Sequence, residues 1–220
     1  MSPVRLTKLG HSCVRVEVGE RRVVVDPGAW SDPAALDGAA AVLVTHQHPD
    51  HLDAARLRAA LDANAALEVW APADVVAALG VEGPAATRVH AVGPGEEFEA
   101  AGVPVQVLGE WHATIHPDIP RLANLGYLLA GRVLHPGDAL LVPEGGVEVL
   151  LVPVSAPWLR LADVIDYVRA VAPATALPVH DKIYSAAGLA IVGRQLGPDG
   201  VGLGPTVYRP WTDGETVTLD

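Results

Sequence analysis

The chain has 220 residues, of which half are apolar and 19% are charged, and its formal net charge is −11. This composition is globular, and the length fits a single domain over residues 1–220 better than two domains. The acidic balance argues against a nucleic-acid-binding protein, because phosphate backbones require a basic face. A small-molecule substrate, including an anionic one, remains compatible, since bound cations can dominate the field of a site.

The cysteine content and the apolar runs of the chain bear on its cellular compartment. The single cysteine, Cys13, cannot form an internal disulfide or a thiolate metal cluster, and we expect it to be a small buried residue. Residues 1–9 contain charges and no apolar signal-peptide core, and no apolar run approaches the roughly 20 residues of a membrane span. A cytoplasmic protein without a membrane span is therefore expected.

Strand-like and helix-like patterns alternate in two halves of comparable length. In the first half we expect strands at 4–9, 13–18, 22–25, 42–44 and 68–70, and helices that follow Asp53 and Pro72. In the second half we expect strands at 88–92, 103–108, 125–129, 133–135, 147–152 and 175–177, and helices at 161–168 and from Ser185. Residues 205–220 include a strand-like stretch at 216–218 and receive no chemical role. The predicted architecture is two sheets packed face to face with helices outside, an α/β (α+β) fold.

Four side chains that can bind metal lie within six residues, directly after an apolar strand: His46, His48, Asp50 and His51. Alternate residues of an extended chain point the same way, so His46 and His48 can bind one ion together. Asp50 and His51 come after a proline turn and can face a second ion. The cluster predicts a metal site rather than a polar strand end with a helix cap.

A site for two metals needs more donors, and these are expected at the carboxyl ends of other strands. His112, Asp138 and His180 each follow a different predicted strand. His116 competes with His112, because spacing alone does not separate them. His112 is preferred because it comes first after its strand.

These residues together resemble a known family. The run THQHPDH at 45–51, followed by His112, Gly137-Asp138 and His180, resembles the metallo-β-lactamase superfamily along the whole chain. The segments LGHSC at 9–13 and VDP at 25–27 further resemble the branch that contains ascorbate-6-phosphate lactonase and N-acyl-phosphatidylethanolamine phospholipase D.

The resemblance implies a four-layer αββα sandwich, the metallo-β-lactamase fold, with an active site along one edge of the sheets. It implies a first metal bound by His46, His48 and His112. It implies a second metal bound by Asp50, His51 and His180, with Asp138 bridging the two. Asp50 and His51 together favour the hydrolytic two-metal pattern over the di-iron redox members. Ala139 departs from the family, where many relatives have Thr or Ser.

Nitrogen and oxygen donors without sulfur suit Zn²⁺, with Mn²⁺ or iron as alternatives. Two such ions, roughly 3.5–4 Å apart, would hold a bridging water as hydroxide near neutral pH. We expect this hydroxide to cleave a small ester, lactone or phosphoester, while Asp50 orients it and takes up its proton. Asp50, His51 and Asp138 are the predicted catalytic residues.

Further residues are predicted to orient the donors or to face the substrate: His11, Asp26, His116, Arg121, His135, Trp158 and Lys182. A plain turn at Asp26 and a packed strand histidine at His135 are equally compatible with the sequence. The alternative function is a non-catalytic metal-binding or ligand-sensing module of the same fold. A nuclease or a di-iron redox protein is less favoured, and association into a homo-oligomer is compatible with the sequence.

Overall fold

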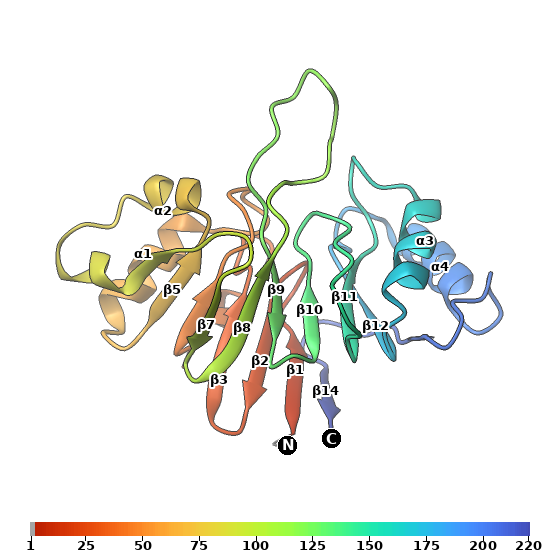
Figure 1. Ribbon diagram of the computed structural model, residues 1–220, viewed down its shortest axis with the longest axis horizontal. Coiled ribbons are helices and arrows are strands. Elements are labelled where there is room, and N and C mark those ends of the chain that lie inside the picture. Colours follow the sequence, from red (N-terminus) through yellow and green to blue (C-terminus); the bar gives the residue numbers. More distant parts are fainter. Residues whose placement is uncertain (1–2) are drawn as a thin grey trace.

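The computed structural model describes residues 3–220. Two seven-stranded sheets lie face to face in the middle of the molecule, and two helices flank each outer side (Figure 1). The predicted four-layer αββα arrangement is thereby confirmed. Among residues 3–220, no helix combines the length and the apolar character that crossing a membrane requires.

The first sheet has the strand order β14-β1-β2-β3-β4-β5-β6. Strands β1 to β3 form an antiparallel meander, and β3 to β6 run parallel. The bounds are β1 Val4–Lys8, β2 Val14–Val18, β3 Arg21–Val25, β4 Ala41–Leu43, β5 Glu68–Ala71, β6 Val89–Ala91 and β14 Thr216–Leu219. Helices α1 (Ala54–Ala63) and α2 (Ala73–Leu79) cover its outer face.

The second sheet has the order β13-β12-β11-β10-β9-β8-β7, and β10 to β13 run parallel. The bounds are β7 Glu97–Ala100, β8 Val103–Leu108, β9 Gly126–Leu129, β10 Val133–His135, β11 Val149–Pro153, β12 Thr175–Val179 and β13 Val207–Tyr208. Helices α3 (Leu161–Val171) and α4 (Ala186–Leu196) cover this sheet.

Local sequence explains most of these elements. In β8, buried valines alternate with the exposed Pro104 and the half-buried Gln106, which is the two-residue period of a strand with one face in the core. Helix α1 begins where the Asp53 carboxylate accepts a hydrogen bond from the backbone N–H of Arg56 at 3.0 Å. Helix α2 ends at Gly80, whose φ of 56° favours glycine.

The core consists of three layers of buried side chains. The central layer lies between the sheets and includes Leu43, Tyr127 and Leu151, all fully buried. An outer layer packs α1 and α2 against the first sheet, and another packs α3 and α4 against the second. Each fully buried leucine contributes about 1.5–3 kcal/mol relative to an exposed one. The sheets therefore form a rigid support for the loops at their edges.

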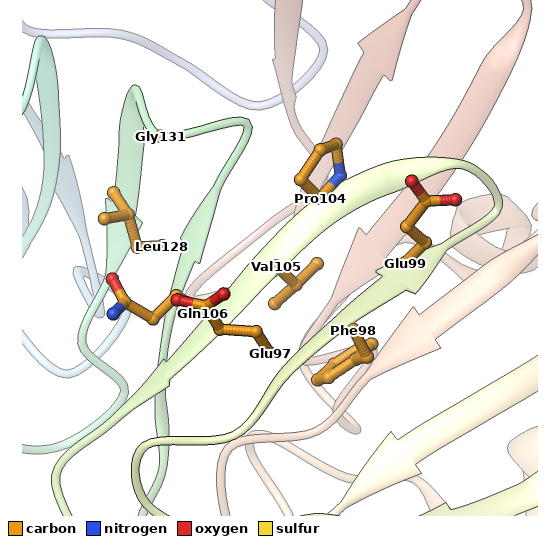
Figure 2. A pocket seen from close by; sticks show the side chains of 8 residues that line it. All are labelled: Glu97, Phe98, Glu99, Pro104, Val105, Gln106, Leu128 and Gly131. Atoms are coloured by element: carbon orange, nitrogen blue, oxygen red, sulfur yellow. The ribbon is translucent and has the colours of Figure 1, made fainter.

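Two strands were not predicted from the sequence, and both lie at a sheet edge. Strand β7 presents Glu97 and Glu99 to solvent, and β13 has only two residues. The hollow on the outer face of β7 to β9 is shown in Figure 2, where Glu97 lies beside its strand partner Gln106. Its lining contains no histidine or aspartate, so it lies apart from the candidate metal centre.

Candidate metal centre

The candidate donors meet at one edge of the two sheets because each follows the carboxyl end of a strand. His46 follows β4, His112 follows β8, Asp138 follows β10 and His180 directly follows β12. Parallel strands end at the same edge, so residues far apart in the chain come together there.

The donors form two groups, and within each group the candidate ligand atoms lie within 4.8 Å of one another. The first group is His46, His48, His112 and Asp138. The second group is His11, Asp50, His51 and His180.

Asp138 belongs to the first group and also lies against two histidines of the second group. Its Oδ2 lies 3.3 Å from His112 Nε2 and 3.1 Å from His180 Nε2, and its Oδ1 lies 3.1 Å from His51 Nε2. A cation in either group would therefore have a carboxylate oxygen of Asp138 within reach.

Several of these buried atoms lack a hydrogen-bond partner among the described residues: His51 Nε2, His112 Nε2, His180 Nε2 and Asp138 Oδ1. Their neighbours are close but are not aligned for a hydrogen bond. An unsatisfied buried polar atom costs about 1–3 kcal/mol, and most such atoms in folded proteins are paired. Nitrogen and oxygen atoms that converge without partners fit a divalent cation such as Zn²⁺.

In three histidines, the ring nitrogen that faces away from the candidate centre is held by a contact outside the two groups. His112 Nδ1 donates to the carbonyl of Ala113 at 2.6 Å, and His180 Nδ1 donates to the carbonyl of Ser155 at 2.5 Å. His51 Nδ1 lies 2.6 Å from Asp26 Oδ2. A proton on Nδ1 leaves the Nε2 lone pair free to bind a cation.

His46 is fixed in the same way through Thr45. The Thr45 hydroxyl donates to Asp26 Oδ2 at 2.7 Å, so towards His46 Nδ1, 3.0 Å away, it acts as an acceptor. His46 Nε2 and His48 Nδ1 then lie 3.0 Å apart and face the same point. Asp26 thus orients two histidines, one directly and one through Thr45.

His11 has a different hydrogen-bonding pattern. The backbone N–H of Lys182 donates to His11 Nδ1 at 3.3 Å, so a neutral ring carries its proton on Nε2. That nitrogen lies 3.2 Å from Asp50 Oδ2 and donates to it. Burial lowers the pKa of His11, which favours the neutral ring. Because both of its ring nitrogens are engaged, His11 is assigned as a hydrogen-bond donor to Asp50 and not as a ligand of a cation.

At the candidate centre, neighbouring groups of opposite charge offset the effect of burial on the pKa values. Burial alone would raise the pKa of Asp138, but His51, His112 and His180 hold it well below its usual range. Burial alone would lower the pKa of His180, but Asp138 and Asp50 raise it to about 9, and a cation bound at Nε2 would displace the second proton of the ring. The carboxylates therefore stay ionised and require positive charge beside them.

The remaining predicted residues lie around the centre. Trp158 Nε1 donates to Asp138 Oδ2 at 3.2 Å. His135 is buried and contacts the backbone of Ser12 and Gly137, so it holds the turn before Asp138. The exposed His116 joins neither group, and its Nδ1 accepts a hydrogen bond from the backbone of Asp118.

Arg121 and Lys182, the two basic residues predicted to face the substrate, both make contacts within the protein. Arg121 Nε donates to the carbonyl of His112 at 3.1 Å, and its guanidinium lies 5.7 Å from the Trp111 ring centroid. Lys182 Nζ donates to the carbonyl of Trp30 at 2.7 Å and pairs with Asp213 at 3.2 Å.

Three residues that support the candidate donors were not predicted from the sequence: Thr45, Asn124 and Ser155. Asn124 Oδ1 accepts a hydrogen bond from the backbone N–H of Asp138 at 2.8 Å, and Ser155 bonds His180. Thr45 stands inside the histidine motif and had a sequence signal. Asn124 and Ser155 contact donors that are far from them in the sequence, and no motif in the sequence marks either residue.

The backbone at this edge takes unusual conformations. His11, Asp26 and His180 have positive φ values of 53°, 53° and 56°, which are costly for residues other than glycine. At Gly28, a Cβ atom would lie 1.9 Å from the carbonyl oxygen of Asp50, so only glycine permits that approach. Such strain is typical of functional sites.

A buried ion pair supports the turn that carries His180. Lys8, at the end of β1, pairs with Asp181 and donates to the carbonyl of Pro178 at 3.3 Å. The Lys8 side chain is fully buried, although it comes from the opposite sheet. The turn after β12 is therefore tied to the first sheet.

The donors open onto a cavity of about 220 Å³. Beyond the donors, its walls are Trp30, Ile115, Pro157, Trp158 and Ile183. The candidate centre is thus accessible to a small molecule on one side and buried on the other.

Comparisons with known proteins agree with this architecture. The family model described as beta-lactamase superfamily domain matches residues 5–180. Protein Rv0786c of Mycobacterium tuberculosis is 42% identical over 82% of this chain and 85% of its own length. UPF0173 protein PF0020 of Pyrococcus furiosus is 32% identical over 84% of this chain and 86% of its own.

Among solved structures, Igni18, a metallo hydrolase from Ignicoccus hospitalis, superposes with a TM-score of 0.73 at 21% identity. The match covers 100% of this chain and 99% of Igni18. At this identity the likeness shows the fold alone.

Proposed function

Because the chain belongs to the metallo-β-lactamase superfamily, we propose that it is a metal-dependent hydrolase with a binuclear centre acting on a small ester, lactone or phosphoester. The observation that carries this proposal is the pair of donor groups joined by Asp138 and open to a cavity.

The donor chemistry supports two divalent cations, with Zn²⁺ as the first candidate. His46, His48 and His112 would hold one ion, Asp50, His51 and His180 the other, and Asp138 both. When bound, such ions supply Lewis-acid activation of a water molecule and of the bond to be cleaved.

Asp50 is the residue proposed to take up a proton. Its carboxylate lines the cavity and receives a hydrogen bond from His11 Nε2. Its pKa lies far below the usual range: burial would raise it, but the hydrogen bond from His11 and the nearby imidazoles of His180 and His51 outweigh this effect. The ionised carboxylate can therefore orient water by accepting a hydrogen bond from it, and the proposed proton transfer depends on the lower pKa that bound cations would give that water.

Trp158 restricts the movement of Asp138. Its indole N–H donates to Asp138 Oδ2, while its ring forms part of the cavity wall. The same side chain can thus orient the shared carboxylate and exclude bulk water from the reacting groups.

The proposal is tested with the purified chain, stripped of metal and reloaded with Zn²⁺ or Mn²⁺. Metal content is measured by mass spectrometry, and hydrolysis is measured on p-nitrophenyl acetate, a γ-lactone and bis-p-nitrophenyl phosphate. We expect two metal equivalents and hydrolysis of at least one substrate. H112A should lose metal and activity, while the matched variant H116A keeps both.

Two outcomes would contradict the proposal. Metal retained by H112A and lost by H116A would reverse the assignment of the first group. Two bound equivalents with no hydrolysis across the panel would support the non-catalytic metal-binding module instead.

A further inference from the structure

A second cavity adjoins the candidate metal centre. It measures about 250 Å³ and is lined by His48, His112, Ala113, Ile115, Ile119, Pro120, Arg121 and Leu122. It shares His48, His112 and Ile115 with the cavity over the centre. A molecule with its reacting group over the centre could therefore extend a branch into this second space.

The branch cavity is largely apolar. The candidate donors His48 and His112 aside, its lining side chains are aliphatic except for that of Arg121. All of them except His48 come from the loop between β8 and β9, which projects beyond the sheets (Figure 1). A pocket lined mostly by apolar groups with few polar ones favours an apolar ligand.

Arg121 is already engaged where it lines this cavity. Its Nε donates to the carbonyl of His112, and its guanidinium lies over Trp111. A guanidinium against an aromatic face is attracted by the negative face of the ring. These contacts give Arg121 a role in holding the loop against the first group of donors.

The size of the cavity limits the branch. A volume of about 250 Å³ holds roughly eight groups of the size of a water molecule at about 30 Å³ each. A methylene group is of similar size, so a chain of medium length fits and a short one leaves space unfilled.

On the premise of the proposed hydrolytic function, we propose that the substrate is an ester or lactone whose uncharged, medium-length apolar chain lies in this second cavity. Ile119 is a specificity-determining residue, because it lines the branch cavity and not the cavity over the centre.

The test uses the metal-loaded full chain and p-nitrophenyl esters of acetic, butyric, hexanoic, octanoic and dodecanoic acid. We expect kcat/KM to rise at least tenfold from acetate to hexanoate or octanoate and to fall for dodecanoate. I119W should fill the cavity and lower kcat/KM for octanoate at least tenfold, with acetate changed less than twofold. The matched control I191W alters an exposed isoleucine of α4 and should resemble the parent protein.

A binding measurement accompanies the kinetics. The neutral probe 1-hexanol should bind the parent protein in calorimetry and inhibit hexanoate hydrolysis competitively, and I119W should weaken both effects. Equal kcat/KM along the ester series, unaffected by I119W, would overturn the inference and leave the hydrolase intact. Failure to hydrolyse any ester, lactone or phosphodiester would instead count against the proposed function.

Discussion

Asp26 Oδ2 lies 2.6 Å from His51 Nδ1, and the same oxygen accepts the hydroxyl hydrogen of Thr45. Asp26 is fully buried at the end of β3, and Thr45 leads into the histidine run after β4. One carboxylate thereby sets the ring orientation of histidines in both donor groups. These contacts link the segment around Asp26 to the histidine run.

Replacing Asp26 tests this relationship. D26N should lower metal affinity about 10- to 100-fold, because contacts behind a ligand typically contribute this much. A competition assay with a chromogenic chelator measures the affinity, and circular dichroism checks the fold. D62N, on the exposed face of α1, is the matched control. Unchanged affinity in D26N would show that His51 and His46 are oriented by the backbone alone.

His11 should act on Asp50 without binding metal. H11A should retain both metal equivalents and lower kcat about 10- to 100-fold, since Asp50 loses its hydrogen-bond donor. H11Q places an amide nitrogen near the former Nε2 position and should recover most of the activity. The kcat–pH profile of H11A should shift as well, which a purely structural role would not produce. Loss of one metal equivalent in H11A would instead make His11 a ligand.

The Lys8–Asp181 pair should stabilise the fold. Removing one partner of a buried ion pair typically costs about 3–5 kcal/mol, because the other charge stays buried. Asp181 is partly exposed, at 18%, so we expect about 3 kcal/mol for K8M, the lower end of that range. Urea denaturation measures this loss, and the double variant K8M/D181N should recover part of it. A change below about 1 kcal/mol would mean that water replaces the pair.

Cys13 should be chemically inert in the folded protein. It is buried, and burial raises the pKa of its thiol well above the usual range, with the Asp26 carboxylate adding to the effect. The thiolate is the reactive form, so Ellman's reagent at pH 8 should label no thiol until denaturant is added. C13S should leave metal content and activity unchanged. Rapid labelling of the native protein would show that this edge of the sheet opens.

The sequence predicted the strands well where the apolar pattern was strong. The helix starts at Asp53 and Ser185 match because a capping side chain marks each of them. Strand β7 was missed because its acidic residues face solvent at an edge, and β13 was missed because two residues carry no pattern.

The residues predicted from the sequence as metal donors come together in the structure, whereas some of the residues that support them were not predicted. The donors stand in a short motif or directly after strands. The contacts of Ser155 with His180 and of Asn124 with Asp138 depend on packing between distant segments. Spacing could not separate His112 from His116, because only the path of the loop turns one inwards and leaves the other exposed.

The dispersal of the donors along the chain affects the order of events during synthesis. His46 and His51 emerge early from the ribosome, whereas His180 belongs to a turn that forms only when β12 joins β11. In the proposed arrangement each ion has Asp138 as a donor and the second ion also has His180, so neither ion would find its full set of donors on the early part of the nascent chain. Selection between metal ions would then depend on the finished fold, whose sheets and buried turns set the spacing of the candidate donors.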